Sequence, residues 1–406
     1  MVPNGWSEGK VSDLLLGLES GVSVNGTERE IGDNEKAVLK VSAVSYGTFD
    51  PLALKVIEDV QELSRAKVNP KAGQIIISRS NTENLVGASA YIDQNYPNLF
   101  LPDKLWQTIS KPNTEMKWLS YVLASEHARY TLSKLATGTS GSMKNITQGE
   151  LLSLKISIPP YLEQKKIAQT LSTWNQAISA TKKLLENTQQ QKKALMQQLL
   201  TGKKRLLDEN GVSFSDTWKT YKLGQLFKER VEMGRDDLPL LSITADDGVV
   251  YQEETGRKNT SNEDKSKYRR ICVDDIGYNT MRMWQGRSSL SDKDGIVSPA
   301  YTIIIPSEKI VPRFAAYLFK LPKLVHVFYR HSQGLVSDTW NLKFSHFKEI
   351  NWSFPCVKEQ RKIAEVLLIA DQEIDTLQKK LDCLKQEKKA LMQQLLTGKK
   401  RVKVAA

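Results

Sequence analysis

A run of fourteen residues, KKALMQQLLTGKKR, occurs twice without a change, at 192–205 and again at 388–401. The two copies lie 196 positions apart in a chain of 406 residues. Upstream of each copy the same shift aligns PPYLEQKKIAQTL (159–171) with PCVKEQRKIAEVL (355–367). A repeat with so long a period is the mark of a duplicated architecture. The chain is therefore interpreted as a tandem duplication, in which a variable block precedes a repeated segment in each half.

Each repeated segment carries apolar residues at steps of three and four, the heptad spacing of a paired helix. Proline stands where each helix would begin, and Thr-Gly stands where it would end. Roughly 40 residues at about 1.5 Å each predict rods about 60 Å long. Two matching apolar seams of this length favour pairing with each other over ordinary core packing. The seam positions are Ile167, Leu171, Trp174, Ile178, Leu185, Leu195 and Leu199 in the first copy, and Ile363, Leu367, Ile374, Leu381, Leu391 and Leu395 in the second.

The order of the blocks predicts how the helices pair. Because the termini of a domain usually lie close together, the second variable block should leave the first helix and return to the same place. The helices would then be antiparallel. The predicted fold is a pair of α/β (mixed α+β) globular heads joined by a long antiparallel two-helix coiled coil, with a tandem pseudo-two-fold repeat. The expected domains are head 1 (1–158), helix 1 (159–205), head 2 (206–354) and helix 2 (355–406).

Within the heads, short apolar runs alternate with longer helical patterns. One helix is predicted over 114–135, with Thr114 as its N-cap, and another over 312–331. The loops 137–145 and 332–341 are rich in Ser, Thr, Gly and Asn, which is the chemistry of turns. Strands are predicted within 36–44, 74–80, 238–245, 269–279 and 301–306.

The charge balance points to a polyanionic partner. Lys and Arg together exceed Asp and Glu, for a formal net charge of +12. A basic surface of this kind favours nucleic acid ahead of an anionic membrane. No apolar run approaches the ~18–20 residues of a membrane span, and no basic region precedes the first apolar patch, so a secretory signal is not expected. Three scattered cysteines without a CxxC pattern suit a reducing cytoplasm.

Two short matches to enzyme motifs fail on chemistry. Ile158-Pro159-Pro160-Tyr161 resembles the motif of amino-methyltransferases, but Ile158 lacks the side-chain acceptor that would hold the target amino group. Asp103 with Glu115 and Lys117 mimics a metal-dependent nuclease site. However, Glu115 falls in the first turn of the predicted helix and not on a strand, and the other half lacks the match. No phosphate-binding loop or nucleophile elbow occurs, so no active site is predicted.

Several features together resemble one family, the specificity (HsdS) subunits of type I restriction–modification systems. They are the duplicated plan, the identical helix ends, and the block openings WSEGKVSDL (6–14) and WKTYKLGQL (218–226). The segment NTMRMWQGRSSLSDKDGIVSPAY (279–301) also belongs to the resemblance. The resemblance implies that each head is a target recognition domain reading one half of a bipartite, asymmetric site in double-stranded DNA, with the helices setting the spacer.

The same resemblance implies partners. Two methyltransferase subunits would dock on the helical region and methylate adenine at N6, and motor-nuclease subunits would complete the restriction complex. S-adenosylmethionine, ATP and Mg²⁺ would belong to those partner subunits, with no cofactor or metal in this chain. The chain itself would be a non-catalytic, cytoplasmic protein of a prokaryote without a membrane partner. The two copies of the fourteen-residue run would offer equivalent surfaces to two identical partners, although a recent duplication would also explain their identity.

Candidate DNA-binding residues are polar, basic or aromatic side chains in the predicted loops. Phosphate contacts position a protein on DNA, whereas contacts to base edges specify the sequence. Trp284 is also a candidate core residue. The alternative function is a coiled-coil scaffold for protein partners with only non-specific DNA affinity. The candidates are Arg79, Ser80, Asn81, Ser140, Ser142, Lys144 and Asn145 in head 1, and Arg257, Lys258, Asn259, Arg282, Trp284, Gln285, Arg287, Ser337, Trp340 and Asn341 in head 2.

Overall fold

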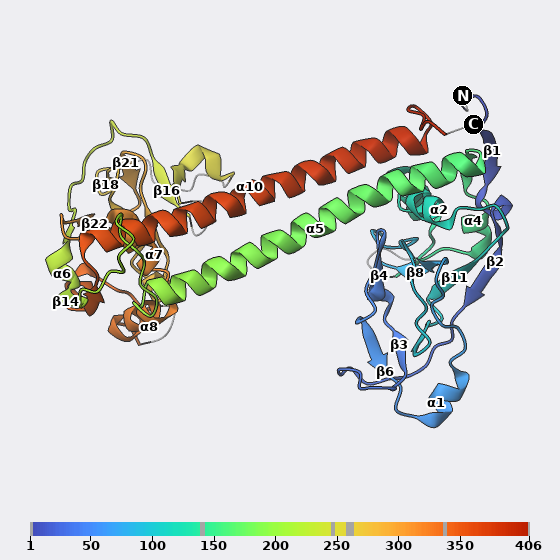
Figure 1. The fold of residues 1–406 in the computed structure, drawn as a ribbon, viewed down its shortest axis with the longest axis horizontal. Coiled ribbons are helices and arrows are strands. Elements are labelled where there is room, and N and C mark those ends of the chain that lie inside the picture. The colour runs from blue at the N-terminus through green and yellow to red at the C-terminus, as the bar shows by residue number, and fades with distance from the viewer. Residues whose placement is uncertain (1–2, 139–142, 245–247, 257–263, 336–338, 405–406) are drawn as a thin grey trace. The chain divides into compact units, whose positions relative to one another are not determined.

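The computed structural model forms two compact units. Unit 1 comprises Met1–Thr181 and Lys380–Ala406, and unit 2 comprises Lys182–Lys379. Each unit contains one head and a part of both long helices, because α5 (Tyr161–Leu199) and α10 (Val357–Leu396) contribute to both. The described residues are 3–138, 143–244, 248–256, 264–335 and 339–404. Both units combine strands with helices, as the mixed α/β prediction requires (Figure 1).

The central sheet of unit 1 has four antiparallel strands in the order β2-β11-β7-β9. Its strand β7 reads as a continuous apolar run, and Ile75, Ile76 and Ile77 are all fully buried. Successive side chains of a strand point to opposite faces. Accordingly, Ile75 and Ile77 belong to one core and Ile76 to another. The strands are β2 (Leu15–Ser20), β11 (Leu105–Ser110), β7 (Ile75–Ser78) and β9 (Ser89–Tyr91).

The second core of unit 1 lies between this sheet and a smaller one. The smaller sheet has the order β10-β3-β6, with α1 (Val60–Arg65) close by. Figure 1 shows β3, β6 and α1 at the end of unit 1 that lies away from α5. A short hairpin, β4 (Val44–Ser45) with β5 (Thr48–Phe49), borders the same core. The strands of the smaller sheet are β10 (Leu99–Phe100), β3 (Ala37–Leu39) and β6 (Leu54–Val56).

The helix predicted over 114–135 is two helices, α2 (Met116–Leu123) and α3 (Glu126–Leu135). Ser125 interrupts it, because its extended backbone and its hydroxyl, which accepts a hydrogen bond from the N–H of Ala128 at 3.3 Å, make it the N-cap of α3. The predicted N-cap Thr114 is also wrong. Glu115 caps α2, accepting from the N–H of Lys117 at 3.3 Å. A short helix, α4 (Gln148–Leu152), follows further along the chain.

Unit 2 is built on a corresponding four-stranded antiparallel sheet, β15-β22-β19-β20. Two ribbons, β16 with β17 and β18 with β21, pack beside it on a separate small core. The sheet strands are β15 (Phe227–Glu229), β22 (Tyr301–Pro306), β19 (Ile276–Asn279) and β20 (Ser288–Leu290). The ribbon strands are β16 (Leu241–Ile243), β17 (Val249–Tyr251), β18 (Arg269–Ile271) and β21 (Gly295–Val297).

The helix predicted over 312–331 is also two helices, α7 (Pro312–Leu318) and α8 (Pro322–His331). Leu321 has the extended backbone (φ −68°, ψ 122°) that a residue before proline prefers, so α7, which ends at Leu318, is not continued and a new helix begins at Pro322. Two short helices, α6 (Leu223–Leu226) and α9 (Phe344–Phe347), complete the head.

Each long helix is fastened to the head that precedes it by the glutamine of its repeated Glu-Gln pair. The Gln164 side chain accepts a hydrogen bond from the backbone N–H of Glu115 at 3.0 Å. Gln360 accepts the equivalent bond from Val311 at 2.8 Å. Antiparallel strand pairs lead into both helices. They are β1 (Ser7–Lys10) with β13 (Lys155–Ile158), and β14 (Lys219–Lys222) with β23 (Asn351–Phe354).

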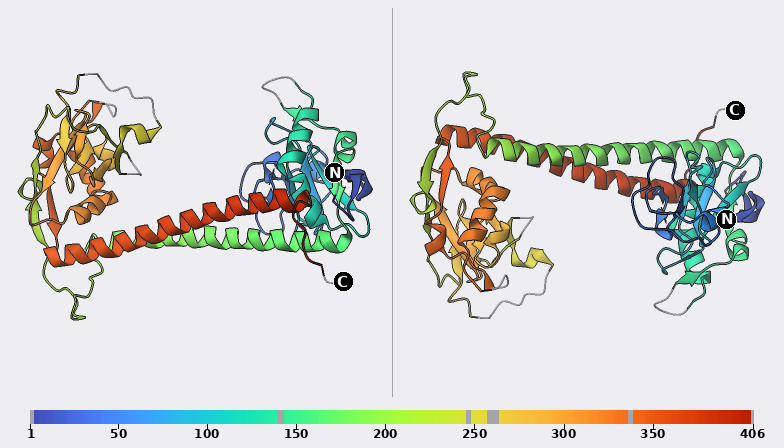
Figure 2. Two further views of the ribbon diagram at one scale, coloured as in Figure 1. Left: turned by 90° about the horizontal axis from the view of Figure 1, so that it is seen from above. Right: turned by 90° about the horizontal axis from the view of Figure 1, so that it is seen from below.

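Each unit is closed by the helix end of the other repeat. In unit 1, Arg401 donates from two nitrogens to the buried carboxylate of Glu163, both at 2.7 Å. In unit 2, Arg205 makes the same forked contact with Glu359, at 2.6 and 2.7 Å. The start of one long helix therefore lies beside the end of the other within each unit, and the views in Figure 2 agree. Locally, the two helices run antiparallel.

The apolar seam positions are withdrawn from solvent along both helices. Trp174, Ile178, Leu195, Ile374 and Leu391 are half-buried. Leu395 belongs to the core of unit 1 and Leu199 to the core of unit 2, so each helix end packs in a head that its own repeat does not encode. The fully buried seam positions are Ile167, Leu171, Leu185, Leu199, Ile363, Leu367, Leu381 and Leu395.

Candidate nucleic-acid interface

The two loops predicted from their turn chemistry are structurally equivalent. In head 1, Thr137 and Asn145 exchange two backbone hydrogen bonds, at 2.9 and 2.8 Å. In head 2, Gln333 and Asn341 do the same, both at 2.8 Å. Each pair closes the base of a loop at positions related by the 196-residue shift. Both heads thus present a loop from the same frame, with different side chains.

A glycine beside each bridge explains how these loops turn. Gly138 has a φ of +145° and Gly334 a φ of +147°, which other residues rarely adopt. A Cβ on Gly138 would lie 2.7 Å from the carbonyl oxygen of Met143, and a Cβ on Gly334 would lie 2.7 Å from that of Thr339. Glycine is therefore required for close approach as well as for φ. The candidates Ser140, Ser142 and Ser337 lie outside the described residues, as do Arg257, Lys258 and Asn259.

In head 1, the structure brings together two candidate groups that are far apart in sequence. Strand β8 (Ser80–Asn81) pairs antiparallel with β12 (Lys144–Asn145). The side chains of Ser80 and Asn81 are buried, and Asn81 accepts a hydrogen bond from the backbone N–H of Thr82 at 2.8 Å. These two residues therefore support the loop at 137–145 from inside the fold and are not exposed to a ligand. Lys144 is half-buried and Asn145 is exposed, so they are the groups a ligand could reach.

Arg79 is held in place by an acidic residue. Its Nε donates to the backbone carbonyl of Asp103 at 2.7 Å, and its Nη2 lies 3.3 Å from the Asp103 carboxylate. About a third of the side chain, 33%, remains exposed. Asp103 and Glu115, the carboxylates of the nuclease-like match, thus serve as an ion-pair partner and a helix cap.

Head 2 carries an aromatic row of four side chains: His326, Tyr329, Trp340 and Trp284. The His326 and Tyr329 rings stack at 5.8 Å, Tyr329 meets Trp340 edge-on at 4.8 Å, and Trp340 meets Trp284 edge-on at 5.3 Å. The Nε1 of Trp284 donates to the carbonyl of Met281 at 3.0 Å. Trp284 and Trp340 are half-buried, so Trp284 lies at the surface of the fold rather than in its core. The row joins the loop at 332–341 to the turn after β19.

The remaining head 2 candidates flank this row. Arg282, Gln285 and Arg287 lie in the turn between β19 and β20, where Gln285 and Arg287 are exposed. The turn is fixed by Gly286, whose φ is +74° and whose carbonyl accepts from Lys320 Nζ at 2.9 Å. The side-chain amide of Asn341 is committed to its own loop, since it donates to the carbonyl of Gln333 at 3.2 Å.

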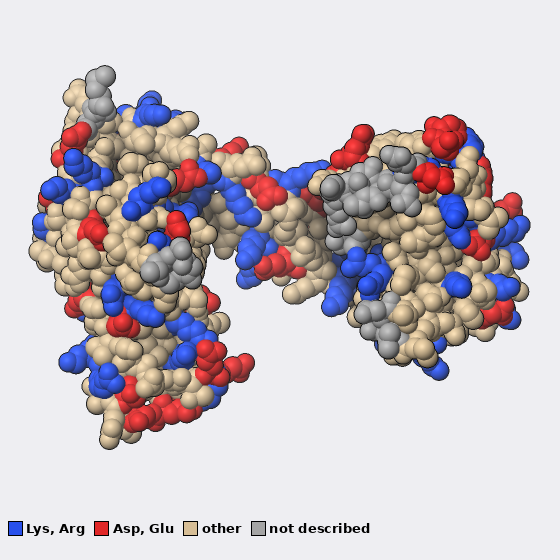
Figure 3. Space-filling view, turned by 180° about the vertical axis from the view of Figure 1, so that it is seen from behind, with Lys and Arg blue, Asp and Glu red and all other residues tan. Residues whose placement is uncertain are grey.

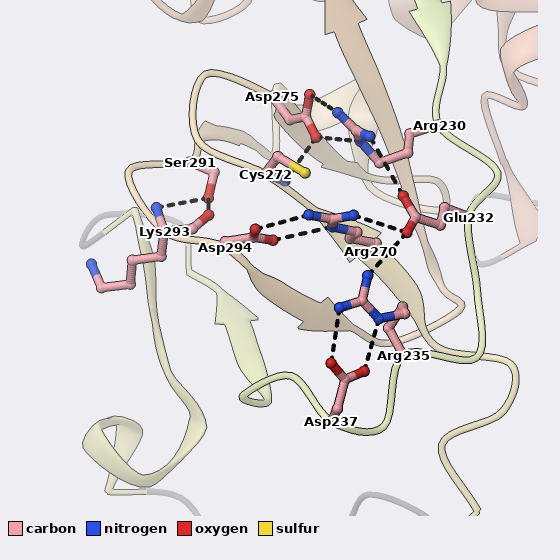
Figure 4. Close-up of polar contacts among 10 residues, drawn as sticks. All are labelled: Arg230, Glu232, Arg235, Asp237, Arg270, Cys272, Asp275, Ser291, Lys293 and Asp294. Atoms are coloured by element: carbon pink, nitrogen blue, oxygen red, sulfur yellow. Dashed lines mark hydrogen bonds and ion pairs between the residues drawn. The ribbon is translucent and has the colours of Figure 1, made fainter.

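The arginines of head 2 fall into two groups. Arg230, Arg235 and Arg270 join a network of carboxylates that ties β18 and β21 to the segment after β15 (Figure 4). By contrast, no carboxylate within the described ranges pairs with Arg282 or Arg287. Arginines already committed to ion pairs support the fold, whereas arginines without such partners can bind phosphate or guanine.

The network itself is anchored in the interior. Asp275 is 2% exposed, and its carboxylate accepts hydrogen bonds from Arg230 at 2.6 and 3.1 Å. Arg270 bridges Glu232 at 2.9 Å and Asp294 at 3.0 Å. The hydrogen bonds from Arg270 hold the pKa of both carboxyl groups below their usual range. The network therefore ties the ribbon of β18 and β21 to the residue that precedes β19.

One end of unit 1 carries acidic side chains that form ion pairs. Figure 3 shows acidic side chains gathered over β3, β6 and α1. There Arg29 is held between Glu35 at 2.7 Å and Glu58 at 2.9 Å, and this contact lowers the pKa of Glu35 to about 2. None of the candidate DNA-binding residues belongs to β3, β6 or α1.

Sequence reasoning missed His326, Tyr329 and Lys104. Tyr329 stands three residues after His326 on α8, a spacing that puts both on one helix face and leads toward the loop at 332–341. Lys104 lies beside the head 1 loop, with its Nζ 3.6 Å from the sulfur of Met143. Nothing local in the sequence marks Lys104, because its neighbour is 39 positions away.

Among the described residues, no group of three or more His, Cys, Asp or Glu side chains is placed to bind a metal ion. Within the same ranges, no helix combines the length and the apolarity needed to cross a membrane.

Comparisons with known proteins agree with this architecture. A sequence model described as "Type I restriction modification DNA specificity domain" matches residues 3–190 and 215–386. A Methanocaldococcus jannaschii protein bearing the name of the type I restriction enzyme MjaX specificity subunit is 25% identical, covering 99% of this chain and 95% of its own length. The type I restriction enzyme StySPI specificity subunit of Salmonella potsdam is 22% identical, covering 94% of this chain and 85% of its own length.

Solved structures share the fold. The S subunit of a type I restriction-modification system from M. genitalium superposes with a TM-score of 0.58 at 16% identity, and 98% of each chain is covered. The HsdS subunit from Thermoanaerobacter tengcongensis superposes with a TM-score of 0.51 at 15% identity, also over 98% of each chain.

Proposed function

Because the chain belongs to the type I restriction–modification DNA specificity family, we propose that it reads a bipartite, asymmetric site in double-stranded DNA, one half-site with each head. The observation that carries the proposal is the pair of loops at 137–145 and 332–341. The same backbone bridge closes both, yet their side chains differ. Equivalent frames with different side chains are what two recognition domains for two different half-sites require.

In head 1, Lys144 and Asn145 are the groups proposed to contact DNA, and Arg79 is oriented by Asp103. In head 2, Arg282 and Arg287 are proposed to contact base edges or phosphates, beside the aromatic row. Arginine on guanine is the commonest specific contact in the major groove. A contact with DNA is also proposed for the candidates outside the described residues, which are Ser140, Ser142, Arg257, Lys258, Asn259 and Ser337.

The two long helices are proposed to form an antiparallel coiled coil that sets the spacer between the half-sites. Its support is the local antiparallel contact within each unit and the burial of the seam. The proposed domains are head 1 (1–158), helix 1 (159–205), head 2 (206–354) and helix 2 (355–406).

Two methyltransferase subunits and the motor-nuclease subunits are the proposed partners, in the cytoplasm of a prokaryote. S-adenosylmethionine, ATP and Mg²⁺ are proposed to bind to those partner subunits. This chain is proposed to contribute recognition of DNA without catalysis. The methyltransferase subunits would transfer a methyl group to adenine N6, and the motor-nuclease subunits would complete the complex that cleaves DNA.

Mapping of N6-methyladenine in cells that express this chain with its methyltransferase partner tests the proposal. A single bipartite motif with two unlike halves is expected. Purified complex should also prefer that motif over a duplex with scrambled half-sites and the same spacer, measured at one fixed salt concentration. Equal affinity for all duplexes would favour the alternative, a scaffold that touches DNA only through its charge.

A further inference from the structure

The two copies of KKALMQQLLTGKKR meet different side chains. In unit 1, the second lysine of the run forms an ion pair with Glu126, which is the first residue of α3. Lys389 Nζ lies 2.6 Å from Glu126 Oε1, and Gln393 Nε2 donates to Glu126 Oε2 at 3.2 Å. One carboxylate thus joins a lysine and an amide that stand one helical turn apart.

In unit 2 the corresponding carboxylate is missing. The 196-residue shift relates Lys193 and Gln197 to the pair that binds Glu126, and relates Pro322 to Glu126 itself. Pro322 is the first residue of α8, as Glu126 is of α3. Proline offers no acceptor in its side chain. Within the described ranges, no carboxylate pairs with Lys193.

A cavity of about 440 Å³ opens at this place in unit 2. Its polar wall includes Lys193 and Gln197 beside the ion pair of Lys192 with Asp371, and its apolar wall includes Met196, Leu321 and Pro322. A basic group and an amide above an apolar floor suit a side chain with both a carboxylate and an aliphatic stem, which can pack as well as pair.

The neighbouring lysine of the run shows the opposite pattern. In unit 2, Lys192 pairs with Asp371, which also accepts from the Tyr317 hydroxyl at 2.5 Å. In unit 1 the position of Asp371 is Asn175, and Lys388 instead lies over the ring of Tyr121 at 5.7 Å. A carboxylate therefore neutralises Lys389 in unit 1 and Lys192 in unit 2, which are different positions of the repeated run. The charge left over at the cavity in unit 2 is that of Lys193.

We propose that this cavity is the docking site for an acidic side chain of the methyltransferase subunit, bound by Lys193 and Gln197 as Glu126 is bound in unit 1. The inference rests on the proposed function, because it takes its partner from there. The chain itself supplies the evidence for the occupant, since a carboxylate is what the same helix surface binds in unit 1. The two copies of the run are then unequal docking surfaces despite their identical sequence.

Two variants test the cavity in different ways. Lys193→Glu reverses its charge. Pro322→Glu supplies the carboxylate from within the chain, at the start of a helix where an acidic residue is favourable. Lys389→Glu is the matched control, since it changes the same residue of the run in unit 1. Native mass spectrometry and titration calorimetry of the full chain with its methyltransferase subunit would count the bound copies and measure each affinity.

Both cavity variants are expected to weaken one of two methyltransferase sites by about tenfold or more, whereas the control changes neither site by more than about twofold. Thermal unfolding of each variant would establish that the fold is kept. Unchanged binding by both cavity variants would overturn the proposal, and so would a wild-type chain that binds no methyltransferase subunit. Normal methyltransferase binding with weaker DNA binding and a shallower salt dependence would instead identify a phosphate contact. A wild-type complex without sequence preference would overturn the proposed function alone.

Discussion

The ion pair between Arg205 and Glu359 is expected to be the contact that most strongly secures the end of α5 in unit 2. The Glu359 side chain is 1% exposed, and Arg205, at 23%, covers both of its oxygens. Arg205→Ala would leave a buried carboxylate without its partner, which costs about 3–5 kcal/mol. Glu359→Gln should cost less, because the arginine that remains can turn toward water.

Hydrogen–deuterium exchange with mass spectrometry suits this test, because it reports each segment of a chain with two compact units separately. A loss of 3 kcal/mol corresponds to exchange on the order of 100-fold faster. This acceleration is expected in 196–202 and 357–367 in Arg205→Ala. Segments of unit 1 should be unaffected, and Arg401→Ala should show the reverse distribution. If exchange in these segments rises by less than about threefold, the forked contact is not what closes the unit.

Three other predictions concern the heads and the spacer. Arg282→Ala should lose about 1–3 kcal/mol of preference at one base pair of a single half-site, as measured by selection from randomised duplexes, while a uniform loss over all sequences would identify a phosphate contact. Deleting seven residues from the middle of α5 should change the preferred spacer and leave both half-sites intact, and an unchanged spacer in methylation mapping would contradict the coiled-coil ruler. The Arg29 contact holds the pKa of Glu35 down, so it contributes stability above pH 4.5 that is lost as the pH falls toward about 2. Carboxyl NMR should place the midpoint for Glu35 near 2 and show it rising in Arg29→Ala, although the hydrogen bond from the Gly32 N–H still holds it below 4.5.

The long helices could be predicted from the sequence because their signals are local. The heptad spacing lies within the segments that become α5 and α10, and the preceding proline and the closing Thr-Gly stand within a few residues of their ends. The breaks at Ser125 and Leu321 also have local signals, a capping serine and a residue before proline, but an amphipathic pattern continues across both. The continuing pattern led to one helix being predicted where the structure has two.

The candidate site was less accessible to prediction, because its geometry depends on contacts between distant residues. Ser80 and Asn81 have the right chemistry for DNA, but pairing with a strand 64 positions away buries them. Arg79 is engaged by Asp103, and the partner of Tyr329 in the aromatic row is Trp340. Residue type suggests what a side chain can bind, whereas the partners it meets in the fold decide whether it is available.

The forked contact of Arg401 with Glu163 bears on how a protein of this architecture could arise. Unit 1 takes its closing segment from residues 388–401, and residues 192–205 are an identical copy of that segment. A fragment of residues 1–205 therefore contains both a head and the piece that completes it. Two such fragments could exchange ends and form a closed, symmetric homodimer. Its two identical heads would read a palindrome, so a gene of half this length would already encode a working ancestor, and fusion of two copies would free each half-site to diverge.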